Sequence, residues 1–138
     1  MVFQTQLRFS TDGRGTYNIS TQINEVIDKS GITTGICHVF VQHTSASLIL
    51  CENADPEVRT DLETFMKKLV PDGDPMFKHQ DEGTDDMPAH VRTILSGNAI
   101  SIPVHKGRSH LGTWQGVFLW EHRTHRYKRN LSITIIGE

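Results

Sequence analysis

Hydrophobic and polar residues alternate along much of this chain with a period of two, which is typical of half-buried β-strands. The alternation is clearest in residues 130–137, where Leu131, Ile133 and Ile135 are separated by Ser132 and Thr134. The same pattern, together with β-branched and aromatic residues, predicts further strands. They cover residues 2–9, 17–19, 35–43, 47–52, 98–104 and 115–123.

Three other segments have apolar residues at helical spacing. The first covers residues 21–29 and the third runs from about Pro88 to just before Gly97. The second is the clearest, because Asp55 can cap it and Pro56 fits its first position. Its apolar stripe is predicted to be buried and consists of Val58, Leu62, Phe65, Met66 and Leu69.

Strands grouped without regular strand–helix alternation indicate an α+β protein with a mainly antiparallel sheet. We therefore expect a single domain over residues 1–138, similar to a β-sandwich, with about three flanking helices. A chain of 138 residues is long enough to bury a core of its own.

Composition excludes several classes of function. The net charge of −2 gives no basic patch for nucleic acid or for an anionic membrane. No apolar run has the length of a membrane helix, and the first residues lack the apolar region of a signal peptide. Cys37 and Cys51 are too few for a disulfide framework and suit a reducing compartment. We expect a cytoplasmic protein.

The segment from His79 to His90 holds the densest group of polar side chains. It contains two histidines and four carboxylates within twelve positions. Imidazole and carboxylate ligands suit Zn²⁺, Mn²⁺, Ni²⁺ or Mg²⁺, so we expect a divalent-metal site formed by His79, Asp86 and His90. Two alternatives stay open: the segment is a solvated acidic loop, or Asp86 only caps the third helix.

Two strands place polar residues at the ends of apolar faces. His43 shares a face with Val39 and Val41, and Glu121 shares one with Val117 and Leu119. Each is a candidate general acid or base.

Structural roles are the alternative at both positions. His43 is then a hydrogen-bonded core residue, and Glu121 is the ion-pair partner of Arg123.

Cations and glycines in residues 106–116 suit the binding of an anion, with Lys106 and Arg108 as candidates. The pattern matches no phosphate-binding motif, so a hairpin turn explains it equally well. The basic segment 123–129 is predicted to be a solvated hairpin loop between the last two strands.

Four segments in sequence order, spanning nearly the whole chain, resemble the YjbQ-type family, whose members are also called secondary thiamine-phosphate synthase enzymes. The matching segments are His43-Thr-Ser-Ala-Ser-Leu, Glu52-Asn-Ala-Asp-Pro56, Glu82-Gly-Thr-Asp-Asp-Met-Pro-Ala-His90, and Leu111-Gly-Thr-Trp-Gln-Gly116 with Glu121. Ser109 and His110 depart from the family pattern, in which apolar residues are usual.

The resemblance implies a β-sandwich-like α+β fold and a homotrimer with pockets between subunits. It also implies a weak thiamine-phosphate synthase activity, which joins a pyrimidine pyrophosphate to a thiazole phosphate and releases pyrophosphate. Its site residues in this chain are His43, Ser45, Asn53, His79, Asp86, His90, Gln115 and Glu121.

We expect His43 and Glu121 to be catalytic. The small phosphorylated substrate is then bound by Ser45, Asn53, Arg108 and Gln115. A metal-dependent phosphate or ester hydrolase and a non-catalytic metabolite-binding module are the alternative functions.

Overall fold

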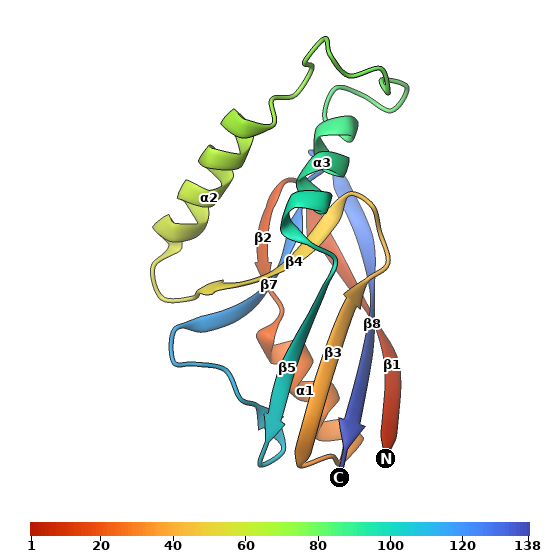
Figure 1. The fold of residues 1–138 in the computed structure, drawn as a ribbon, viewed down its shortest axis with the longest axis vertical. Helices are drawn as coiled ribbons and strands as arrows, with labels where there is room; N and C mark the ends of the chain where they lie inside the picture. The colour runs from red at the N-terminus through yellow and green to blue at the C-terminus, as the bar shows by residue number, and fades with distance from the viewer.

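Antiparallel pairing joins the strands of this protein into two sheets (Figure 1). The computed structural model describes residues 1–138. Its elements in chain order are β1 (Val2–Asp12), β2 (Gly15–Asn18), α1 (Ser20–Ser30), β3 (Thr34–Val41), β4 (Ala46–Glu52), α2 (Pro56–Leu69), α3 (Asp86–Ser96), β5 (Ala99–His105), β6 (Arg108–Ser109), β7 (Gln115–Glu121) and β8 (Arg126–Gly137).

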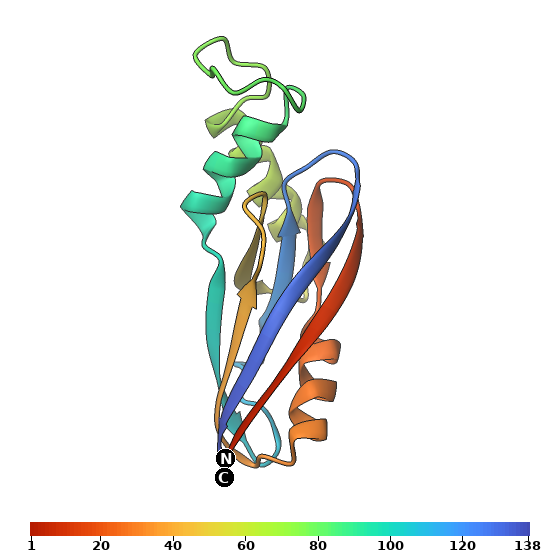
Figure 2. The same ribbon diagram turned by 90° about the vertical axis from the view of Figure 1, so that its right-hand side faces the viewer.

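The larger sheet has the strand order β1-β8-β3-β5-β6, and the smaller one has the order β2-β7-β4. Every strand pair is antiparallel. These findings confirm the α+β class and the antiparallel sheet. The large sheet is twisted and curled (Figure 2), so the architecture is less regular than the expected sandwich.

One hydrophobic core joins the inner faces of both sheets to α1. Leu131, Ile133 and Ile135 of β8 are fully buried, as their alternation predicts. Val117 and Leu119 of β7 enter the same core from the small sheet. Phe118 and Trp120 on the opposite side of β7 are buried as well, so this strand is covered on both faces.

The three helices lie at different ends of the sheets. In Figure 1, α1 lies behind the large sheet near the chain termini, whereas α3 lies at the opposite end and α2 lies to one side. Gly31 ends α1 in the left-handed conformation (φ 70°) that glycine adopts without strain. None of the helices is long and apolar enough to span a membrane.

The predicted burial of the α2 stripe is wrong for most of its members. Met66 is the one buried residue of the helix, whereas Phe65 and Leu69 are 64% and 55% exposed. Helical spacing identifies an apolar face but not what covers it, and within this chain little packs against the outer half of α2.

The predicted solvated loop over residues 123–129 is also wrong. β8 already begins at Arg126 and pairs with β1, so the turn is shorter. Arg123 and Arg129 are buried, because each reaches carboxylates inside the protein. Arg129 is two residues before Leu131 on β8, so its side chain points to the same, inward side of the strand. The many cations in this segment suggested exposure to solvent instead.

Candidate metal centre

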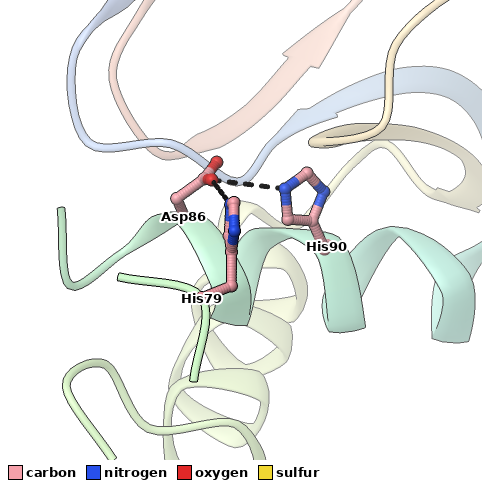
Figure 3. A group of neighbouring side chains, drawn as sticks. All are labelled: His79, Asp86 and His90. Carbon is pink, nitrogen blue, oxygen red and sulfur yellow. Dashed lines mark hydrogen bonds and ion pairs between the residues drawn. The ribbon is translucent and has the colours of Figure 1, made fainter. Parts of the chain in front are cut away.

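The start of α3 positions the two helical members of the polar cluster. Asp86 is the first helical residue and His90 follows one turn later on the same side of the helix. Pro88 is tolerated between them, because backbone N–H groups in the first turn have no partner within the helix. His79 comes from the long connection between α2 and α3 and returns to the same point (Figure 3).

Three potential ligand atoms converge at this point. The Nε2 atoms of His79 and His90 lie 2.7 and 3.3 Å from Oδ2 of Asp86. All three atoms lie within 4.8 Å of one another. Ligands of a tetrahedral Zn²⁺ ion are about 3.3 Å apart, so small side-chain movements would let all three bind one ion.

Neighbouring groups orient two of the three ligands. Nδ1 of His90 lies 3.0 Å from the carbonyl oxygen of Thr44 and must donate to it, because a carbonyl only accepts. In the neutral ring this hydrogen bond leaves the Nε2 lone pair directed at the cluster. Arg123 Nη1 donates to Oδ1 of Asp86 over 2.8 Å, which leaves Oδ2 for the cluster. Such second-layer contacts are typical of metal sites.

Arg123 also binds the neighbouring carboxylate. Its Nε donates to Oδ2 of Asp85 over 2.9 Å, and the backbone N–H of Thr124 donates to the same oxygen. Burial acts to raise the pKa of Asp85, but these hydrogen bonds outweigh it and lower the pKa to about 2. One guanidinium thus faces two buried carboxylates, and this excess of negative charge favours a cation.

These contacts argue against both alternatives for the cluster. Asp85 is the residue at the N-cap position, and its carboxylate makes no capping hydrogen bond. Asp86 is 2% exposed and is bound to His79 and Arg123, so it is neither a cap nor part of a solvated loop. The loop description does fit Asp81 and Glu82, which are exposed.

His43 lies close to the cluster but in the β3–β4 loop, because β3 ends at Val41. Its Nε2 accepts a hydrogen bond from the backbone N–H of Asn130 over 2.8 Å. Burial lowers the pKa of His43, Arg129 lowers it further, and Glu121 acts in the opposite direction. His43 is therefore a neutral ring with one nitrogen already bound.

Glu121 is fully buried below this loop. Its carboxylate accepts hydrogen bonds from Arg129 and from the hydroxyl of Thr11. The ion-pair partner is thus Arg129, whereas Arg123 contributes only its backbone N–H. With no exposed surface for substrate, Glu121 has the geometry of a structural residue.

Ser45 belongs to the same buried network. Its hydroxyl and its carbonyl oxygen both accept hydrogen bonds from Nη2 of Arg129. Ser45 is 8% exposed, so its hydroxyl is bound inside the protein.

The remaining predicted substrate ligands lie at the other end of the sheets. Arg108 pairs with His105, six residues along β5 from Ala99 at the cluster end, which places it about 20 Å away. Gln115 is likewise at the opposite end of β7 from Glu121, and Asn53 Nδ2 donates to its carbonyl oxygen. Within one chain, therefore, Arg108, Asn53 and Gln115 do not share a site with His79, Asp86 and His90.

Sequence reasoning missed Arg123, Asp85 and Thr44 as supports of the cluster. The sequence did contain an indication for Arg123. Its side chain is on the same strand face as Glu121, and a cation buried on that face needs a carboxylate partner. Thr44 offered none, since its contribution is a backbone carbonyl.

The fold and the cluster define an antiparallel α+β protein with two histidines and one aspartate converging at the start of a helix. The chain matches the family described as UPF0047 protein YjbQ-like over residues 5–138, and it belongs to that family. A UPF0047 protein of Synechocystis is 49% identical over 135 residues, covering 98% of this chain and 92% of that protein. YjbQ of Escherichia coli O157:H7 is 43% identical over 139 residues, covering 100% of both chains.

Solved structures agree with this assignment. A YbjQ-like protein of unknown function from Sulfolobus solfataricus has a TM-score of 0.90 at 29% identity, covering 100% of this chain and 99% of that one. A conserved hypothetical protein from Thermus thermophilus has a TM-score of 0.86 at 31% identity, covering 96% and 99%. The resemblance seen in the sequence is confirmed at the level of the family.

Proposed function

We propose that this protein is a metal-dependent enzyme acting on a small phosphorylated molecule, with a divalent ion held by His79, Asp86 and His90. The observation that carries the proposal is the convergence of three ligand atoms within 4.8 Å, two of them oriented by Thr44 and Arg123. Three protein ligands leave coordination positions open, as in catalytic rather than structural zinc sites.

The bound ion would supply Lewis acidity, polarising a phosphoryl or carbonyl oxygen of the substrate. The protein's own contribution is to hold the site in place. Asp86 provides the negative charge, and Arg123 fixes its carboxylate while balancing part of that charge. The hydrogen bond from His90 to Thr44 keeps the imidazole in the tautomer that can bind a metal.

For the reaction, we propose thiamine-phosphate synthase chemistry, which the family resemblance implies. Displacing pyrophosphate requires cations near the leaving group, and within one chain Arg108 is separated from the cluster by the length of β5, about 20 Å. A second copy of the chain would have to bring Arg108, Asn53 and Gln115 to the metal. The proposed reaction therefore requires an assembly such as the expected homotrimer with pockets between subunits.

Exposed apolar residues also support self-association. Ile36 and Ile136 are paired on the outer face of the large sheet and are 56% and 57% exposed. Phe65 and Leu69 of α2 are exposed as well. Exposed apolar patches commonly mark contact surfaces. Light scattering should give the mass of a trimer, and a monomer at micromolar concentration would refute this part of the proposal.

A metal-dependent phosphate or ester hydrolase is the second candidate. The pocket beside His90 contains no Lys or Arg. This composition favours a hydrolase, because attack by water on an ester releases no pyrophosphate whose charge cations would have to stabilise. In this case a single subunit contains the whole site.

The metal site is tested by calorimetric titration of tag-free, chelator-treated protein with Zn²⁺. We expect one ion per chain in the wild type and none in His79→Ala/His90→Ala. His38→Ala is the matched control, because His38 is an exposed histidine that contacts Ser101 and does not belong to the cluster. Equal binding by the wild type and the double variant would refute the site.

Product analysis then distinguishes the functions. Pyrophosphate released only when the pyrimidine pyrophosphate and the thiazole phosphate are both present identifies the transferase. Phosphate or alcohol released from a single ester identifies the hydrolase. Binding without turnover identifies a metabolite-binding module and refutes the enzyme.

A further inference from the structure

A cavity of about 360 Å³ lies directly beside the metal cluster. The β3–β4 loop forms one wall, and α3 with the residues that follow it forms the other. Its volume falls within the range of small-molecule sites. It is lined by His43, Thr44, His90, Thr93, Ile94, Gly97 and Asn98. Because His90 belongs to both the cavity and the cluster, a ligand bound here is next to the metal ligands.

The tautomer of His43 follows from its backbone contact. Nε2 accepts the N–H of Asn130, so in a neutral ring the proton resides on Nδ1. Nδ1 has no hydrogen-bond partner within the protein and is accessible to solvent. His43, which lines the cavity, therefore presents an accessible N–H donor, and it has no free lone pair with which to take a proton.

The chemistry of the wall limits what binds there. None of its seven residues is Lys, Arg, Asp or Glu. The Thr93 hydroxyl is already donated to the Ala89 carbonyl, whereas Ile94 is 82% exposed and offers an apolar contact. A phosphate dianion would lose its hydration here without gaining a cation in return. An uncharged polar group with an acceptor atom, such as a ring nitrogen or a carbonyl oxygen, fits better.

We propose that this cavity holds the uncharged end of the substrate, and that His43 orients an acceptor atom of that end by donating from Nδ1–H rather than acting as a base. The proposal rests on the proposed metal site, toward which the charged end of the substrate would point. His43 is then a positioning residue that selects for an uncharged acceptor, either a ring nitrogen or a carbonyl, amide or hydroxyl oxygen.

Two variants separate a donor from a base. In His43→Asn the amide nitrogen is the same number of bonds from Cβ as Nδ1, so the donor is retained. In His43→Leu it is lost. Both variants lose the hydrogen bond with Asn130, so a structural effect of that loss should be the same in the two variants. The probe is acetohydroxamate, which chelates a metal and carries oxygen acceptors, titrated calorimetrically into the zinc-loaded protein.

We expect His43→Leu to bind acetohydroxamate roughly 3- to 10-fold more weakly than the wild type, as for the loss of one hydrogen bond. His43→Asn should retain most of the affinity. Equal affinity of His43→Leu and the wild type, or equal losses in both variants, would overturn the inference. All three proteins should bind Zn²⁺ alike, so a wild type that fails to bind Zn²⁺ refutes the proposed function instead.

The tautomer is tested independently on the unaltered protein by ¹⁵N NMR of the imidazole rings at neutral pH, with His43→Asn used for assignment. We expect a protonated Nδ1 and an unprotonated Nε2 for His43. The opposite tautomer, with the proton on Nε2 and none on Nδ1, would overturn the donor role.

Discussion

Replacing Glu121 with Gln distinguishes most directly between structural and catalytic uses of the buried network. The Glu121 carboxylate is fully buried and accepts hydrogen bonds from the Arg129 guanidinium, the Thr11 hydroxyl and the Arg123 backbone N–H. Gln keeps one acceptor oxygen and turns an NH₂ group toward N–H donors. It also leaves Arg129, which is 3% exposed, without a countercharge.

Removing one member of a buried ion pair typically costs about 3–5 kcal/mol. The unfolding entropy of a chain of this length is about 0.29 kcal/mol/K, so this loss lowers Tm by about 10–17 °C. Urea denaturation followed by circular dichroism, at one fixed protein concentration, measures the loss directly. Turnover per folded molecule should change little, because Glu121 has no exposed atom.

Glu82→Gln is the matched control. Glu82 is also a carboxylate near an arginine, but its side chain is 68% exposed and lies 3.8 Å from Arg123. Its replacement should change stability by no more than about 0.5 kcal/mol. If Glu121→Gln unfolds at the wild-type urea concentration but loses turnover, the structural assignment is refuted and Glu121 acts in catalysis.

Two further predictions concern the support of the metal cluster. The pKa of Asp85 falls from 3.8 to about 2 on folding, so its contribution of about 2 kcal/mol is present above pH 4 and is lost as the pH falls from about 4 to 2. The stability difference between wild type and Asp85→Asn should shrink over that window in acid denaturation, and a constant difference would contradict this. Arg123→Lys keeps the charge but loses the forked contact with Asp85 and Asp86, so calorimetry should show Zn²⁺ binding weakened about 10- to 100-fold in a folded protein. Unchanged affinity would show that Arg123 does not orient Asp86.

Much of the fold was predictable because alternation with period two reports burial directly. Leu131, Ile133 and Ile135 face the core as expected, and the same parity continues to Arg129. The pattern therefore contained the burial of Arg129, but the charge of the segment suggested solvent instead. The prediction for the α2 stripe failed for the opposite reason: Phe65 is apolar and correctly spaced, yet little in this chain covers it.

The parts of the site that lie within one helix were predictable from spacing, whereas contacts between residues distant in the sequence were not. Asp86 and His90 are one helical turn apart, so their proximity follows from spacing. His79 was expected at the cluster because of its ligand chemistry, although no periodicity describes the path of the irregular connection that returns it there. The partner of Glu121 depends on strand pairing across the turn, which brought Arg129 rather than Arg123 to the carboxylate.

The distribution of site residues over the fold constrains how the protein can work. The metal ligands and His43 lie at one end of β5, and Arg108 lies at the other end, about 20 Å away. No small substrate spans that distance, so one chain cannot use both groups on one molecule. If the activity requires Arg108, it must therefore depend on assembly and disappear when the subunits separate. If it requires only the metal cluster and the cavity beside it, it must persist in a monomer.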